Sequence, residues 1–184
     1  MGTLGANAPT VAANDGTVGT VVFTDTSNIL TSDDSRASAI LLLGEQSQYL
    51  KATGFQFSIP LDATINGILV EWERSGTVLS AGIDAACRLV KAGVPVGNDR
   101  SAGGNWPTTD AFQSYGGAAD LWGTTWTPAE ISAVGFGAAL SCSAVLALTA
   151  GVDSVRITVY YAGSNRAAFS KEMFKVGDGT WCSN

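Results

Sequence analysis

The sequence contains no histidine, few charged side chains and only three cysteines, and these shortages exclude several kinds of site. Without histidine, a Ser-His-Asp triad cannot form. Charged residues make up 14% of the 184 residues and the net charge is −6, so the chain lacks the basic footprint of a nucleic-acid binder. Hydrophobic residues reach 46% and glycines number 22. We therefore expect function to lie in surfaces and arms, with no enzyme activity, no cofactor and no nucleic-acid partner.

The carboxylates do not form a recognisable catalytic or metal-binding motif. Glu71 and Glu73 are the closest pair on one face of a predicted strand. Catalytic carboxylates of glycosidases usually come from separate elements across a cleft, so this pair is typical of a solvated strand face. The segments GVDS and GDG lack the spacing of a calcium loop. We predict no catalytic residue and no metal site.

The three cysteines are far apart in the sequence and indicate neither a disulfide framework nor a zinc site. Cys87 and Cys142 lie in alternating apolar stretches, which predicts two buried thiols. A disulfide between them would require facing β-carbons, which a sequence does not show. Cys182 is predicted to be an exposed thiol, with a cross-link to a neighbouring subunit as the alternative.

No targeting or membrane segment is evident. The N-terminus lacks the basic region and apolar core of a signal peptide. Residues 131–152 carry no charge and are long enough to span a membrane. They are rich in Gly, Ser and Ala and alternate with period two, so we interpret them as two strands joined by a short turn and expect no membrane partner.

Residues 37–162 have the pattern of an all-β domain. Alternation is clearest in 64–74 and 153–161, where apolar residues share one face and polar residues the other. The expected strands are 39–43, 49–57, 64–74, 82–91, 134–141, 144–148 and 153–161. They predict an antiparallel β-sandwich, jelly-roll-like, with extended N- and C-terminal arms. One helical turn is expected at 127–131, with Thr127 as N-cap and Glu130 completing a capping box.

The two ends of the chain differ in composition from this domain. Residues 1–36 are poor in large apolar side chains and fit either a flexible lead-in with an edge strand near 20–24 or an arm that orders on a partner. Residues 163–184 form a tail that either packs back on its own domain or docks on a neighbour. The docking candidates are Phe169, Met173, Phe174 and Trp181.

Residues 96–126 show little periodicity but are rich in aromatic side chains. Long loops of this kind are often functional. The segment either folds back as a lid on the sandwich, its tight turn at Tyr115-Gly116-Gly117, or presents rings that stack on sugars. The candidate glycan contacts are Trp106, Tyr115, Trp122 and Trp126.

Segments spread through residues 40–161 resemble a β-sandwich module of tailed-bacteriophage virion proteins that also occurs in bacterial surface proteins. The segments FSIP…ATINGI, RLVK, WPT, YGG…DLWG and RITVYY occur in the order of that module. The resemblance is fairly specific for the fold and weak for function, because one sandwich serves many roles. The terminal arms lie outside it.

The resemblance implies a virion structural protein, most simply a capsid decoration or cement protein on the capsid exterior. Its arms would then contact the major capsid protein or other virion proteins, and a homo-oligomer, by preference a trimer, is expected. A tail or fibre component is the alternative within this class. The competing class is a carbohydrate-binding adhesion module that uses the four aromatic residues above.

Overall fold

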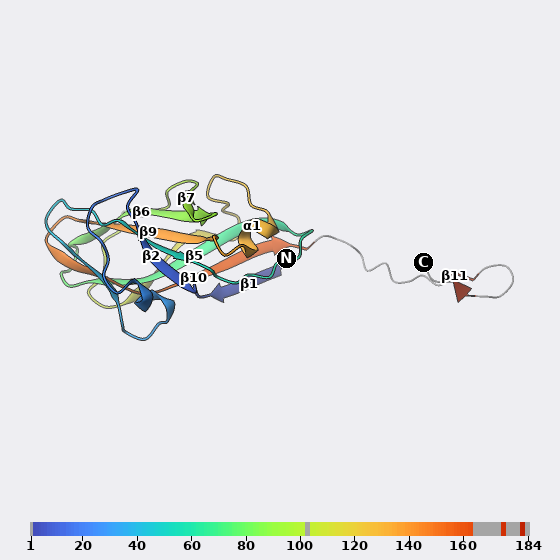
Figure 1. Cartoon of the computed structure of the whole chain (residues 1–184), viewed down its shortest axis with the longest axis horizontal. Helices are drawn as coiled ribbons and strands as arrows, with labels where there is room; N and C mark the ends of the chain where they lie inside the picture. Colours follow the sequence, from blue (N-terminus) through green and yellow to red (C-terminus); the bar gives the residue numbers. More distant parts are fainter. Residues whose placement is uncertain (1, 102–103, 164–173, 176–180, 183–184) are drawn as a thin grey trace.

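Two antiparallel β-sheets lie face to face in the computed structural model, which describes residues 2–101, 104–163, 174–175 and 181–182 (Figure 1). The first sheet has the order β1 (Gly2–Asn7), β10 (Leu148–Ala162), β5 (Thr64–Gly76), β8 (Ala111–Gly117), with β3 (Ala37–Leu41) also paired to β10. The second has the order β2 (Val11–Asp15), β4 (Tyr49–Thr53), β9 (Gly137–Ala144), β6 (Gly82–Lys91), β7 (Val94–Val96). The expected antiparallel β-sandwich is confirmed.

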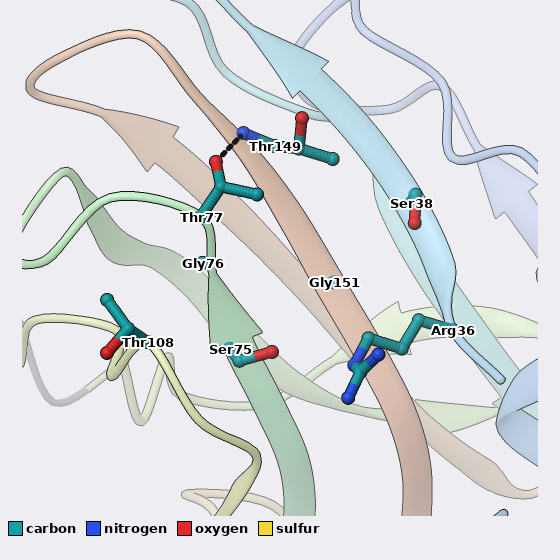
Figure 2. Close-up of a pocket in the computed structure, with 8 residues that line it drawn as sticks. All are labelled: Arg36, Ser38, Ser75, Gly76, Thr77, Thr108, Thr149 and Gly151. Atoms are coloured by element: carbon teal, nitrogen blue, oxygen red, sulfur yellow. Dashed lines mark hydrogen bonds between the residues drawn. The ribbon is translucent and has the colours of Figure 1, made fainter. Parts of the chain in front are cut away.

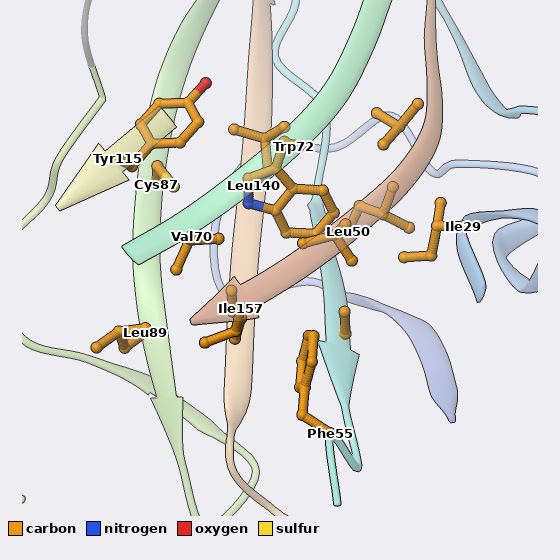
Figure 3. Packing of buried hydrophobic residues seen from close by; sticks show 14 of the residues in the cluster. Ile29, Leu50, Phe55, Val70, Trp72, Cys87, Leu89, Tyr115, Leu140 and Ile157 are labelled. Atoms are coloured by element: carbon orange, nitrogen blue, oxygen red, sulfur yellow. The ribbon is translucent and has the colours of Figure 1, made fainter. Parts of the chain in front are cut away.

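The core lies between the two sheets, where the alternating apolar residues of both meet (Figure 3). Val70 and Trp72 of β5 and Ile157 of β10 point inward, toward Leu50 of β4 and Leu140 of β9. The chain changes sheet at almost every connection, so residues distant in sequence fill each layer. Burial of apolar surface at about 25 cal/mol per Å² stabilises this arrangement.

The strand expected at 153–161 is confirmed as part of β10, Leu148–Ala162, whereas the separate strand expected at 144–148 was wrong, because β9 ends at Ala144 and β10 begins at Leu148. β3 pairs with β10 on one side over residues 148–152, and β5 pairs with it on the other. Pairing on both sides keeps Gly151 extended, whereas the local sequence LTAGVD indicates a turn. The turn lies instead at 145–147, where the Val145 N–H donates to the Ala81 carbonyl over 2.8 Å.

The N-terminal segment supplies edge strands to both sheets. β1 pairs with β10 and β2 pairs with β4. The 3-10 helix η1 (Thr26–Leu30) places Ile29 in the core. The edge strand expected near 20–24 is reduced to single bridges from Val21 to Ser47 and from Thr24 to Ser38. The segment therefore lies along the sandwich in this structure.

Residues 96–126 contain a strand that the sequence did not predict. β8 pairs with β5 from Ala111 to Gly117, and this corrects the tight turn expected at 115–117. Its serine and glycines carry little strand propensity, so pairing with a long neighbour decides its conformation. The helix α1 (Pro128–Ser132) follows, and its capping box between Thr127 and Glu130 is confirmed.

The remaining elements are short. β11 (Phe174–Lys175) and β12 (Trp181–Cys182) pair with each other. Within the residues that the structure describes, no helix is long and apolar enough to cross a membrane. Cys87 and Cys142 are buried free thiols, as expected.

Candidate functional site

A buried ion pair joins the two sheets and holds part of the aromatic segment 96–126 in the core. Nη2 of Arg74 on β5 lies 3.2 Å from Oδ2 of Asp84 on β6. Tyr115 donates its hydroxyl to Asp84 Oδ2 over 2.9 Å, and Trp106 donates Nε1 to Asp84 Oδ1 over 2.8 Å. Burial and the nearby Asp84 charge raise the pKa of Tyr115, so its hydroxyl stays protonated. Trp106 and Tyr115 therefore face the interior.

Trp122 and Trp126 are also anchored inside. Trp122 donates Nε1 to the Ile68 carbonyl over 2.9 Å, and its N–H donates to Asp120 Oδ1 over 2.8 Å. Trp126 meets Phe136 edge to face at 5.4 Å between ring centroids. The Trp122 bond to Ile68 fastens the segment to β5 of the first sheet.

The four aromatic residues form a lid rather than an open platform. Trp106 and Trp122 are 0% exposed, and Tyr115 and Trp126 are buried as well. A sugar ring stacks on an aromatic face that solvent can reach, and protein atoms occupy that position here. Glycan contact through these rings would require them to leave the core.

A hollow of about 320 Å³ opens on the outer face of the first sheet (Figure 2). Strands β3, β5 and β10 and the loop before β8 line it with hydroxyl groups and one guanidinium. The lining residues are Arg36, Ser38, Ser75, Gly76, Thr77, Thr108, Thr149 and Gly151. Gly151 belongs to the floor, where a β-carbon would lie 2.8 Å from Arg36 Cδ. The missing side chain keeps the hollow open and lets Arg36 cross the strand.

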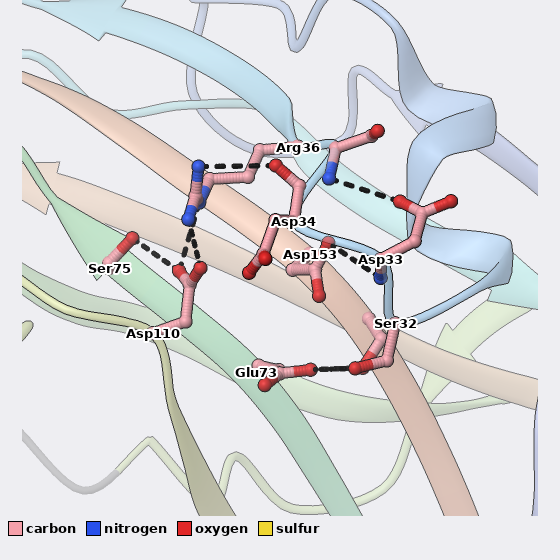
Figure 4. A network of polar contacts seen from close by, with 10 residues as sticks. Ser32, Asp33, Asp34, Arg36, Glu73, Ser75, Asp110 and Asp153 are labelled. Carbon is pink, nitrogen blue, oxygen red and sulfur yellow. Dashed lines mark hydrogen bonds and ion pairs between the residues drawn. The ribbon is translucent and has the colours of Figure 1, made fainter.

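Arg36 is held in place by Asp110 (Figure 4). Its Nε donates to Asp110 Oδ1 over 3.0 Å, and Nη2 also contacts that carboxylate. Ser75 donates to the same Oδ1 over 2.6 Å. The Arg36 guanidinium lowers the pKa of Asp110, so the pair stays charged well into the acid range. The hollow therefore has a rigid polar wall.

A pair of carboxyl groups lies beside this hollow. Asp153 is buried next to Glu73, and burial first, then the charge of Glu73, raises the pKa of Asp153. Glu73 Oε2 accepts hydrogen bonds of 2.8 Å from Ser32 and from Ser154. The Asp33 N–H points to Asp153 Oδ1 at 3.4 Å. The loop around Ser32 is thus tied over the sheet.

A second hollow, of about 220 Å³, lies on the same sheet beyond that loop. It contains Phe112 of β8, 38% exposed, and Arg156 of β10, whose guanidinium carbon lies 4.0 Å from the Phe112 ring centroid. Arg156 also forms two hydrogen bonds, of 2.8 and 3.0 Å, to the carboxylate of Glu71. Glu71 and Glu73 thus belong to the outer strand face, as expected. The outer face of the first sheet combines hydroxyls, charges and the exposed aromatic ring of Phe112.

Exposed aliphatic side chains gather at one end of the sandwich. Three loops meet there through backbone hydrogen bonds, from the Gly44 N–H to the Ala144 carbonyl and from the Val145 N–H to the Ala81 carbonyl, both 2.8 Å. We name their exposed apolar residues the apolar tip: Leu42, Leu43, Val78, Leu79, Val145 and Leu146. Leu43 is 70% exposed and Leu79 is 68% exposed. Clustered exposed apolar side chains of this kind mark interaction surfaces.

The predicted docking residues of the tail are only partly covered by the structure. Phe169 and Met173 lie outside the described residues, and Phe174 and Trp181 are described only as parts of the strands β11 and β12. Cys182 belongs to β12, and its cross-link stays a prediction.

The described residues place no obvious catalytic group in the hollows. Among them, no cluster of three or more His, Cys, Asp or Glu side chains is arranged to hold a metal ion. Burial raises the pKa of Cys142 to about 12 and also raises that of Cys87, so neither thiol is a nucleophile at neutral pH.

No protein-family profile and no curated protein matches the chain. Two solved structures are similar. One is described as "CBM4 structure and function"; it has 11% identity and a TM-score of 0.42, and the match covers 79% of this chain and 92% of the other. The second is the N-terminal cellulose-binding domain of Cellulomonas fimi β-1,4-glucanase C, with 10% identity, a TM-score of 0.39 and coverage of 83% and 90%. At these values the likeness assigns no function to this chain, and neither description names a virion protein.

Sequence reasoning missed both hollows and the apolar tip. Arg36 and Asp110 are 74 positions apart, and no local pattern links them. The tip had a weak signal, because the run Leu41-Leu42-Leu43 continues an apolar strand into a glycine turn. Phe112 was visible as one of several aromatics but did not stand out from those that became buried.

Proposed function

We propose that this chain is a non-catalytic binding module that holds a carbohydrate on the outer face of its first sheet. The observation that carries the proposal is the hollow lined by Ser38, Ser75, Thr108 and Thr149 around Arg36. Sugar hydroxyls donate and accept hydrogen bonds, and serine and threonine hydroxyls do the same. The volume of about 320 Å³ is at the small end of ligand pockets, roughly 300–1,000 Å³.

The rigid wall favours binding of a polar ligand. Because Asp110 holds Arg36 and Ser75 in turn donates to Asp110, little side-chain freedom is lost when a ligand arrives. The hollow is open to water and lacks a ring for stacking, so hydrogen bonds alone supply affinity. We expect weak binding of a short oligosaccharide, with a dissociation constant on the order of 1 mM. This is the ligand class in the name of the cellulose-binding domain above, but the proposal rests on the hollow.

A titration with soluble oligosaccharides, followed by NMR chemical shifts, tests the proposal. The variant Thr108→Val with Thr149→Val removes two hydroxyls and preserves side-chain shape, so binding should weaken at least about tenfold. Thr64→Val, at the opposite end of β5, is the matched control and should bind like the parent chain. Equal binding by all three proteins, or no shift with any sugar, would remove the hollow as a carbohydrate site.

A second function, a structural component of a tailed-phage virion, is favoured by the apolar tip and by the sequence resemblance. A decoration protein needs an exposed apolar surface that a neighbour covers, and the tip supplies one. Its partners would be the major capsid protein or other virion proteins. Quantitative mass spectrometry of purified particles tests this: hundreds of copies support decoration, a handful favour the tail or fibre, and absence ends the virion proposal.

A further inference from the structure

The apolar tip and the start of the tail lie at opposite ends of the same strand. β10 begins at Leu148, which pairs with Leu41 just before the tip. It ends at Ala162, which pairs with Thr64 and leads into residues 163–184. In Figure 1, β10 ends at the same end of the sandwich as the N-terminus and α1. The sandwich thus carries an exposed apolar surface at one end, and its last strand stops at the other.

We propose that the apolar tip binds the C-terminal segment, residues 163–184, of another copy of this chain, so that copies associate head to tail. The segment carries Phe169, Phe174 and Trp181, the large side chains that dominate binding energy when they enter apolar surroundings. The inference does not depend on the carbohydrate hollow, because the tip and the hollow share no residue. The proposal rests on the second function, the structural role in a virion, and names the surface and segment through which copies would assemble there.

Chain length argues for a neighbour as the partner. At about 3.3 Å per residue, β10 is roughly 46 Å long from Ala162 to Leu148. A fully extended chain covers at most about 3.6 Å per residue, so Phe169 reaches roughly 25 Å and Phe174 roughly 43 Å beyond Ala162. Neither can reach the tip of its own molecule, which lies past Leu148; Trp181, at roughly 68 Å, could do so alone, so the three side chains can meet one tip together only on a second copy.

Net charge also favours contact between a tail and a tip over contact between the tips of two copies. Residues 1–162 contain 14 acidic and 7 basic side chains, whereas residues 163–184 contain three basic and two acidic ones. Two sandwich domains that meet tip to tip bring like net charges together. A tail with a small positive excess avoids that repulsion, and Glu45 beside Leu42 on the tip gives it an opposite charge to meet. Head-to-tail contacts of this kind close into a ring or continue as a filament.

Sedimentation velocity of the full chain over a wide concentration range, with reductant present to exclude Cys182 disulfides, tests the proposal. The tip variant is Leu43→Ser with Leu79→Ser and Leu146→Ser. The tail variant is Phe169→Ser with Phe174→Ser and Trp181→Ser. Each variant should raise the dissociation constant of self-association by about 100-fold or more, because three apolar side chains leave the contact. The matched control is Leu61→Ser, which removes a leucine that is 82% exposed outside the tip.

Mixing the two variants is the decisive step. The tip variant retains an intact tail and the tail variant an intact tip, so the mixture should form a complex of two copies although neither self-associates. A parent chain that stays monomeric at every concentration would overturn the proposal. So would a tail variant that associates like the parent, which indicates tip-to-tip contact, or a mixture without a complex.

Discussion

The buried ion pair between Arg74 and Asp84 should be the most sensitive polar contact of the fold. Both side chains are essentially inaccessible to water, and Asp84 accepts further hydrogen bonds from Trp106 and Tyr115. The substitution Asp84→Asn preserves the shape and the Trp106 bond but leaves the Arg74 charge buried without a counter-charge. Breaking one partner of such a pair costs about 3–5 kcal/mol.

Urea denaturation followed by tryptophan fluorescence measures this cost. With a slope of about 2 kcal/mol per M, the loss lowers the unfolding midpoint by roughly 1.5–2.5 M. Glu71→Gln is the control, because its pair with Arg156 lies on the partly exposed outer face and contributes at most about 1 kcal/mol. The double variant Arg74→Met with Asp84→Asn should recover part of the loss, since no charge then remains buried.

A small shift of the urea midpoint in Asp84→Asn would contradict this reasoning. If Asp84→Asn shifts the midpoint no further than Glu71→Gln does, the Arg74–Asp84 pair is hydrated in solution. The two sheets would then be less closely packed around Trp106 and Tyr115 than the structure shows, and the lid would be loose enough to expose its rings.

Three further predictions follow from groups outside this pair. The folded-state pKa of Asp153 is raised above 3.8, so its contribution to stability is fully present at low pH and is lost as the pH rises through the raised pKa. Asp153→Asn should therefore gain stability relative to the parent from acid to neutral pH; a pH-independent difference in urea midpoints contradicts this. Cys87 and Cys142 should react with a thiol reagent only after unfolding, and Cys182→Ser should remove the fast-reacting thiol of the native protein. Gly67→Ala places a β-carbon 2.3 Å from neighbouring backbone and should cost more than about 2 kcal/mol of unfolding free energy by calorimetry.

The sequence predicted the fold class and the interior faces of the long strands. Alternation in β5 placed Val70 and Trp72 inside and Glu71 outside, because the side-chain period of a strand is two whatever the strand pairs with. The same rule predicted the burial of Cys87 and Cys142. The sequence pattern gave wrong predictions where pairing with a neighbouring strand decides the backbone conformation. This happened in β8, which pairs with β5, and around Gly151, where a turn was expected but β10 pairs with β3.

Aromatic composition alone could not distinguish a lid from a sugar platform. Trp106 and Tyr115 are buried because Asp84, on a different strand, supplies the acceptor that each polar ring atom requires inside a protein. Phe112, in the same segment, stays accessible because it lies on the outer face of β8. The difference depends on strand pairing that no local sequence feature reveals.

By itself, then, the sequence determined a histidine-free, low-charge, all-β chain and the inward faces of its strands, since composition and period are local properties. Only the tertiary structure decided which residues meet in the hollow around Arg36 and which leucines and valines remain uncovered at the apolar tip. Both surfaces join segments far apart in the chain. Backbone hydrogen bonds between such segments are chemically alike at every position, so their partners are selected by the packing of the whole sandwich.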